Sequence, residues 1–556
     1  MTYKCSQNFI LRKKKMEINM SSNYNIINRK LLYFHYICKS LALKYLLLHH
    51  MTLFKLIKNL SKAEKRHFKL SSQSSKTENA KYVKLYDILD QMESYDQSIV
   101  LSKMKEGSKS QLNNLKKHLQ QQILNSLVSL KANTDTSAHI RIMIEQSNLL
   151  LDKSMVDDAI SLLNKAKKLA LNYYYYSLAL DVVEKLKTIE LVYIGKNTMD
   201  NNTSLDEQAS FLISKINTVI TLSNISTQLS SLNFRLGYAR SAKDMKIISA
   251  YFKSKLDIIN NSGFGFLENL HYYHCLAWYS LIRYDFVHTH RWLRKSMQLF
   301  DSNPTMKTIY HEHYIRGIAK SLEIMFMTRQ LNPLKKTIAK LHSEQNEILP
   351  RTARVNSHVE LTLILAILNM HMLEGSFVEG TQLESRVEQF LQQSENRIDE
   401  HYLMMVNYKM ACIFFGANDY RGCKRCLARV IAVKNDRYRR DLHVFSRILN
   451  LIASYEIGDD ETLESQIKSV YSYVVKINDM RAVQHAIITF LKRLPYIGAG
   501  EFNSELKKLH QELEPLEVHP YERRPFFYLD IISWLESKIT GVDIGVIRRR
   551  KYTPSR

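Results

Sequence analysis

The chain has 556 residues, of which 15 are glycine and 8 are proline, and its formal net charge is +25. Because glycine and proline supply most tight turns, so few of them argue against a β protein of this length and favour an all-helical fold. An apolar content of 45% excludes general disorder. The 6 cysteines are too sparse for a disulfide framework, so we expect a reducing compartment, the cytoplasm.

The charge favours an acidic partner without identifying one. Lys and Arg number 79 against 54 Asp and Glu, an excess that suits nucleic acid, acidic proteins or anionic membrane surfaces. The same excess also arises when a lysine-rich composition runs through a whole chain, as it does here. No apolar run reaches the length of about 18 residues that a membrane-spanning helix needs, so we expect no span.

Residues 1–50 differ in pattern from the rest of the chain. They carry nine basic residues and one acidic residue, and their apolar residues show no sustained period until about Leu41. Met51 then opens a clear amphipathic pattern. We expect the native protein to start at Met51, with residues 1–50 as a basic upstream extension; a mitochondrial-type or basic binding arm is the alternative, since residues 11–15 read LRKKK.

Residues 51–137 are predicted to form an N-terminal helical segment. Ser61 and Glu64 have the spacing of a capping box, which predicts a helix start at Ser61. Further helices are expected at 81–94 and 108–130, where leucine and isoleucine recur at helical spacing. The polar stretch 132–138 is a plausible joint to the next part of the chain.

From residue 138 to 540 the pattern becomes one of helix pairs. Three pairs, 139–170, 270–300 and 402–431, share a set of residues at equal offsets, in which a small residue is followed by another twelve positions later. A leucine follows four positions after the second one, and an alanine, serine or valine follows three positions after the leucine. Small residues at these positions allow two helices to cross closely. The shared sets are Ser147, Ala159, Leu163, Ala166; Ala277, Thr289, Leu293, Ser296; and Ala411, Cys423, Leu427, Val430.

These pairs resemble the tetratricopeptide repeat family, whose unit is an antiparallel helix pair of about 34 residues. The turn Asn418-Asp419-Tyr420 before Cys423 is similar to the family's turn and second-helix start. The resemblance implies an α-solenoid, a superhelix of stacked pairs, over residues 138–540. Spacings of 130 and 134 between Ala159, Thr289 and Cys423 are near but not equal to four such repeats, so we expect irregular and partly over-long helices. No position matches the family's peptide-binding residues.

The closing residues 541–556 are predicted to be a disordered basic tail. Their cations could contact a partner or an anion, and they are Arg548, Arg549, Arg550 and Lys551.

For the other candidate sites, a structural role in the fold explains the residues better than a chemical function does. Cys423 and Cys426 form a lone CxxC without the second pair that a zinc site needs, so we expect buried structural cysteines. Gly195–Thr198 echoes the end of a phosphate loop but lacks its earlier glycine and preceding strand. Histidines gather in sequence without a zinc motif, at positions 271, 274, 288, 290, 311 and 313. We therefore expect no metal, no cofactor and no enzyme activity.

The sequence thus favours a non-enzymatic helical-repeat scaffold whose concave face binds a protein or peptide. The alternative is a nucleic-acid-binding or regulatory helical protein, favoured by the +25 charge and by 32 tyrosines and 21 phenylalanines able to stack on bases.

Overall fold

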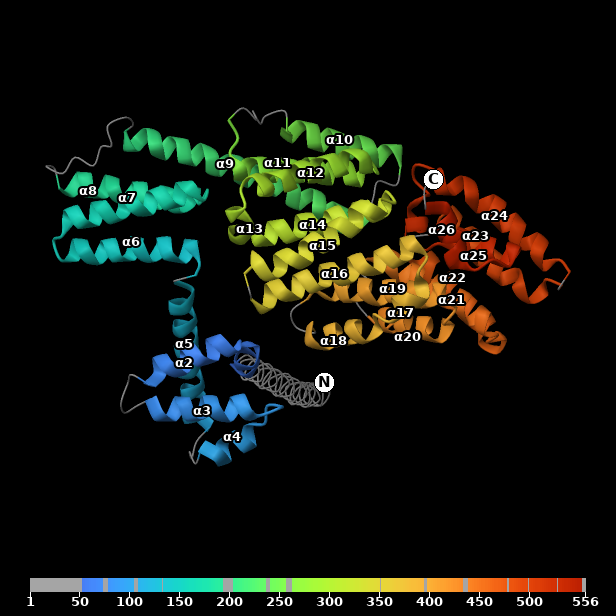
Figure 1. Ribbon diagram of the computed structural model, residues 1–556, viewed down its shortest axis with the longest axis horizontal. Coiled ribbons are helices and arrows are strands. Elements are labelled where there is room, and N and C mark those ends of the chain that lie inside the picture. The colour runs from blue at the N-terminus through green and yellow to red at the C-terminus, as the bar shows by residue number, and fades with distance from the viewer. Residues whose placement is uncertain are drawn as a thin grey trace, which may run out of the picture. The chain divides into compact units, whose positions relative to one another are not determined.

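The computed structural model describes residues 53–552, apart from short gaps at 74–78, 105–108, 133, 194–203, 237–240, 257–262, 351, 395–397, 434–438, 478–479, 499 and 528. The described residues form helices α2 to α26, two short 3-10 helices and their connections, and none of them lies in a strand (Figure 1). The predicted all-helical class is confirmed. The predictions for residues 1–50 and for Gly195–Thr198 fall outside the described residues.

The chain divides into two compact units, Met1–His139 and Ile140–Arg556. In the first unit the predicted capping box at Ser61 is present. The Ser61 amide donates to Glu64 Oε2 over 2.7 Å, and the Glu64 amide donates to Ser61 Oγ over 3.2 Å. Tyr86 and Leu119 are among the side chains of its core. The helices of this unit are α2 (Lys62–Gln73), α3 (Asn79–Gln91), α4 (Gln97–Met104) and α5 (Lys109–Ala132).

The second unit holds the remaining helices, except that α6 begins four residues before the boundary, and most of them pack against their neighbour in the chain, as with α11 and α12 or α19 and α20. The first part contains α6 (Thr136–Asp152), α7 (Val156–Asn172), α8 (Tyr176–Val192), α9 (Leu205–Leu236), α10 (Ala242–Leu256), α11 (Phe266–Ile282), α12 (Phe286–Ser302), α13 (Thr305–Ile309), α14 (His311–Met327) and α15 (Leu331–Glu347). The second part contains α16 (Ala353–Glu374), α17 (Phe377–Thr381), α18 (Glu384–Ser394), α19 (Glu400–Gly416), α20 (Tyr420–Ile431), α21 (Arg440–Ile457), α22 (Asp460–Lys476), α23 (Ala482–Arg493), η1 (Leu494–Tyr496), α24 (Phe502–Val518), η2 (Arg524–Phe527), α25 (Ile531–Thr540) and α26 (Ile544–Tyr552).

One turn geometry recurs between helices of the second unit. At each occurrence a residue with φ between 60° and 78° ends one helix, and the next residue is the N-cap of the following helix. The amide of that N-cap residue donates to the carbonyl five residues earlier, the bond of a Schellman turn, over 2.8 to 3.2 Å. The left-handed residues are Ser154, Tyr174, Tyr284, Arg329, Gly375, Asn418 and Gly458.

The position four residues after each N-cap is buried, and this explains the small-residue pattern of the sequence. Ala159, Thr289 and Cys423 stand at this position and are fully buried. Its other occupants, among them Leu334, did not stand out in the sequence because their size differs from one turn to the next. The remaining buried occupants are Ala179, Gly380 and Leu463. Helix crossing therefore selects for burial at this position rather than for one small residue type.

The helix pairs are longer than a 34-residue unit. The N-caps Asp285, Gln330, Ser376, Asp419 and Asp459 succeed one another at intervals of 45, 46, 43 and 40 residues. The 134 residues from Thr289 to Cys423 thus contain three such intervals rather than four units of about 34 residues, and the units are over-long as the unequal spacing indicated. The extra length comes from irregular pieces such as α13 and from the division of one second helix into α17 and α18.

The C-terminal segment is a packed helix rather than a disordered tail over residues 544–552. Helix α26 packs against α16 and α25, and Ile544 and Ile547 are buried. The backbones of Gly375 and Gly545 approach so closely that a Cβ on either residue would meet the other's carbonyl oxygen. The apolar residues Ile544, Val546 and Ile547 ahead of the basic run supply a face that can be buried, and this face explains why the segment folds.

Candidate functional site

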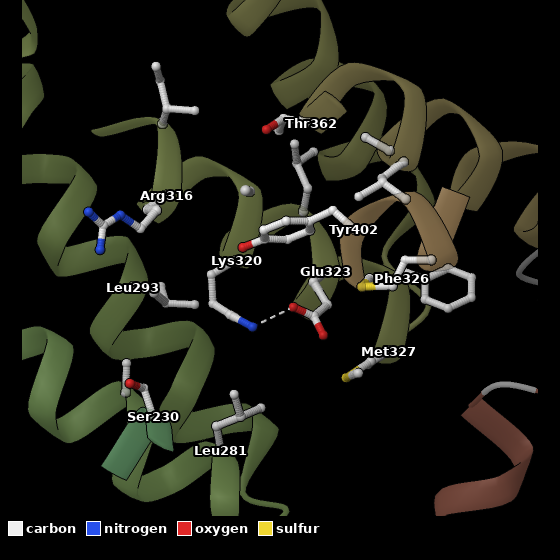
Figure 2. Close-up of a pocket in the computed structure, with 18 of the residues that line it drawn as sticks. Ser230, Leu281, Leu293, Arg316, Lys320, Glu323, Phe326, Met327, Thr362 and Tyr402 are labelled. Atoms are coloured by element: carbon white, nitrogen blue, oxygen red, sulfur yellow. Dashed lines mark hydrogen bonds and ion pairs between the residues drawn. The ribbon is translucent and has the colours of Figure 1, made fainter. Parts of the chain in front are cut away.

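A cavity of about 410 Å³ lies within the second unit, and we call it the inner cavity. Its lining comes mainly from the first helix of successive pairs, namely α11, α14, α16 and α19. Helix α9, Thr289 and Leu293 of α12, the start of α21 and Phe527 of η2 complete it. The volume falls in the range of small-molecule and peptide side-chain pockets. Figure 2 shows a close-up of part of this lining.

Helix α14 presents a polar stripe to the inner cavity. His313, Arg316, Lys320 and Glu323 recur at intervals of three or four residues, so they share one face of the helix, and all four line the cavity. Lys320 Nζ lies 2.6 Å from Glu323 Oε2, and Figure 2 shows the two side chains pointing toward each other. Lys320 also lies over the Trp278 ring, 4.9 Å from its centroid.

A cluster of charges surrounds Glu323, and we call it the charged cluster: Lys320, Glu323, Lys409, Arg439 and Asp441. Burial opposes ionisation of Glu323, but the nearby cations Lys320, Arg439 and Lys409 outweigh burial and lower the pKa of its carboxyl group. Arg439 Nη2 lies 3.0 Å from Asp441 Oδ2, and Asp441 is buried. Four of the five line the cavity, and Asp441 stands behind Arg439.

Lys409 is the unusual member of the charged cluster. It sits on α19 within the apolar sequence LMMVNYKMACIFF, and its Nζ donates to Oδ1 of the buried Asn369 over 2.7 Å. The ammonium lies 4.8 Å from the centroid of the Phe326 ring. Burial lowers the pKa of the Lys409 side chain to about 8. A lysine that interrupts such an apolar helix was the signal in the sequence that could have identified this site.

In contrast to the charged cluster, three histidines of the cavity lining are polar but uncharged. The His313 ring centroid lies 5.3 Å from that of His271 and 5.9 Å from that of His274. Burial lowers the pKa of His271 to about 4 and of His313 to about 3, and lowers that of His274 as well, so these rings are neutral at pH 7. His274 Nε2 and Ser296 Oγ share a hydrogen bond of 3.3 Å.

Three of the six histidines singled out in the sequence therefore meet, and the others do not line the cavity. His288 pairs with Asp285 at the start of α12 over 2.8 Å, and His311 Nδ1 bonds the Thr308 carbonyl over 2.9 Å. Within the described part of the chain, no group of three or more His, Cys, Asp or Glu residues is arranged to hold a metal ion.

The cysteines occupy structural positions. All four cysteines among the described residues are free thiols. Cys423 and Cys426 are buried on α20, and Cys412 lines the inner cavity. Burial raises the pKa of Cys412 to about 12 and of Cys426 to about 11, and raises that of Cys423 as well. A protonated thiol is a poor nucleophile, so none of these three is activated for covalent chemistry.

The predicted tail cations mostly contact the chain itself. Arg548 is buried, and its Nη1 lies 2.7 Å from Asp530 Oδ2 while its Nε donates to the Met372 carbonyl over 3.0 Å. Arg549 donates to the Gly375 carbonyl over 3.2 Å, and Lys551 lies 2.8 Å from Glu536. The exposed Arg550 lies outside these contacts. The four cations therefore do not form one continuous outward-facing patch.

Comparison with known proteins adds no assignment. The sequence matches no protein-family model, and no curated protein matches it significantly. Among the described helices, none combines the length and apolar character needed to cross a membrane. The geometry of the inner cavity is thus the main guide to function.

Proposed function

We propose that this chain is a non-enzymatic scaffold of solenoid-like helix pairs that binds a segment of a partner protein in the inner cavity. The observation that supports the proposal most directly is the lining of that cavity by the first helix of successive pairs. The recurrent Schellman turn, at intervals of 40 to 46 residues from Asp285 to Asp459, supports a tetratricopeptide-like repeat array with longer units. Free cysteine thiols support a reducing compartment such as the cytoplasm.

The charge pattern favours a protein partner over nucleic acid. Several cations of the second helices pair with neighbouring carboxylates: Arg425 Nη2 lies 2.5 Å from Glu384, and Arg386 Nε lies 2.7 Å from Glu360. Three of the four cations of the terminal basic run contact the chain itself. Phosphate recognition needs cations that face outward along one surface. Because these cations pair within the chain, fewer of them are available to bind a phosphate backbone than the formal charge of +25 indicates.

A capture experiment with two matched variants tests the proposal. Ala319 lines the inner cavity, whereas Ala428 is exposed on α20, so Ala319→Trp fills the cavity and Ala428→Trp adds the same bulk elsewhere. We expect the parent chain and Ala428→Trp to capture the same protein from nuclease-treated lysate, and Ala319→Trp to lose it. Circular dichroism checks that both variants keep the parent's helicity.

Two results contradict the proposal. If nuclease treatment abolishes capture, and binding weakens steeply with salt, the partner is nucleic acid. If Ala319→Trp captures the same protein as well as Ala428→Trp does, the partner binds outside the inner cavity.

A further inference from the structure

The inner cavity carries one positive charge more than its carboxylates neutralise. In the charged cluster, Lys320 pairs with Glu323 over 2.6 Å and Arg439 pairs with Asp441 over 3.0 Å. Arg316, farther along the lining, lies 3.7 Å from Glu312, which also lies 3.1 Å from Arg354. Each of these three cations of the lining therefore has a carboxylate within 4 Å. Lys409 is the fourth cation of the lining, and the histidines add no charge at neutral pH.

The direct contacts of Lys409 are with neutral groups, although the Glu323 carboxylate acts on its charge from within the same cluster. Its ammonium donates to the Asn369 amide oxygen and lies over the Phe326 ring, and no ion pair to Lys409 occurs among the residues that the structure describes. A partly buried ammonium with no carboxylate in direct contact is less well solvated than it is in water. A ligand that brings one negative charge to this point would supply the missing partner.

The rest of the lining is suited to an apolar body. Leu281, Leu322, Leu361 and Leu365 line the cavity together with Met327, Met372, Met405, Phe326 and Phe527. Flexible methionine side chains adapt to ligands of differing shape. Removal of apolar surface from water supplies affinity in such a pocket, and a few polar groups fix the orientation of the ligand.

We infer that the inner cavity binds a small amphipathic monocarboxylate, with its carboxylate on Lys409 and its hydrocarbon body against the leucine and methionine side chains. This site goes beyond the proposed partner binding and does not depend on it, since a monocarboxylate would compete with a partner segment for the same cavity. The unpaired cation selects one negative charge, and the apolar lining selects against small hydrophilic anions.

Titration of the purified full-length chain with decanoate and with decan-1-ol tests this inference. The two probes share a hydrocarbon chain and differ in charge, and isothermal calorimetry below the micellar concentration measures both. We expect the parent to bind decanoate at least ten-fold more tightly than decan-1-ol. Lys409→Met removes the cation while keeping similar bulk, and we expect it to bind decanoate at least ten-fold more weakly with decan-1-ol binding unchanged.

Lys507→Met is the matched control, because Lys507 is exposed on α24, outside the cavity, and its substitution removes the same charge from the chain. This variant is expected to bind decanoate as the parent does. Equal affinity of the parent for the two probes would overturn the inference, and so would undiminished decanoate binding by Lys409→Met. Equal losses in both lysine variants would show a general charge effect and overturn it too. Because no partner protein is present, these results are independent of the capture experiment.

Discussion

The partly buried Lys409 leads to a quantitative prediction about stability and pH. Burial lowers its pKa from 10.5 to about 8. Each pKa unit corresponds to about 1.4 kcal/mol, so ionised Lys409 destabilises the folded state by about 3 kcal/mol. Below pH 8 the side chain is charged in both states and this destabilisation is complete.

The direction of the effect with rising pH depends on proton binding. Between pH 8 and pH 10.5 the unfolded chain holds its proton on Lys409 while the folded chain releases it, so the free energy of unfolding rises with pH. About 2 kcal/mol of the destabilisation is recovered by pH 10. Lys409→Met has no such group. It leaves the buried Asn369 oxygen without its donor, at a cost of about 1 to 3 kcal/mol that does not change with pH.

The measurement is urea unfolding of the parent and Lys409→Met at pH 7, 8, 9 and 10, followed by tryptophan fluorescence. The three tryptophans, Trp278, Trp292 and Trp534, all lie in the second unit, so the signal reports the unit that contains Lys409. We expect the parent's unfolding free energy, relative to that of the variant, to increase by about 2 kcal/mol from pH 7 to pH 10.

Lys507→Met serves again as the control, and its unfolding free energy should stay parallel to that of the parent across this range. A difference between the parent and Lys409→Met that is constant with pH would refute the reasoning. It would mean that water or a counter-charge solvates the Lys409 ammonium as well as bulk solvent does.

Three further predictions concern the turns, the terminal helix and the thiols. Ser154→Gly should raise the unfolding free energy by about 1 kcal/mol, because Ser154 has φ 62°, a left-handed conformation that glycine adopts more easily. Ser161→Gly, inside α7, should lower the unfolding free energy by a similar amount. Calorimetry of both variants is the check, and a change of the same sign in both would contradict this account of the turn. Arg548→Ala should destabilise the second unit by about 2 kcal/mol, because it leaves the Asp530 carboxylate without its ion-pair partner. Arg550→Ala should leave the stability unchanged. Urea unfolding compares the two variants, and equal effects would show that the Arg548–Asp530 ion pair does not stabilise the fold. The cysteines at 275, 412, 423 and 426 should resist a thiol reagent at pH 8 until urea unfolds the chain, since burial raises the pKa of each; rapid labelling of these native thiols, located by peptide mass mapping, would contradict this.

The helical periodicity of the sequence was enough to predict most of the helices and their pairing. The turn between α19 and α20, the start of α2 at a capping box and the burial of Cys423 were all predicted from local pattern. The lengths of the repeats were not, because five of the seven left-handed turn residues are not glycine, including Tyr174 and Arg329. Without glycine as a marker, tertiary packing fixes the position of these turns rather than local preference.

The candidate site was less accessible from sequence than the fold. His271, His274 and His313 were noted as a cluster, but their lowered pKa values depend on burial between α11 and α14. The basic run at Arg548 was conspicuous in the sequence, yet its leading arginine serves the packing of α26. Lys409 was not identified as a site residue from the sequence, because its contacts are with Asn369 and Phe326, which are distant in sequence.

One contact ties the inner cavity to a late part of the chain. Arg523 Nη2 donates to the Tyr284 carbonyl over 2.8 Å, across 239 residues of sequence, and Phe527 stacks on Tyr284 while lining the cavity. During synthesis, the ribosome must therefore add more than two hundred residues after Tyr284 before Phe527, which completes the cavity lining, has been made. The earlier helix pairs can form while the chain is still growing, but a nascent chain cannot hold a ligand against Phe527 until that residue has been synthesised.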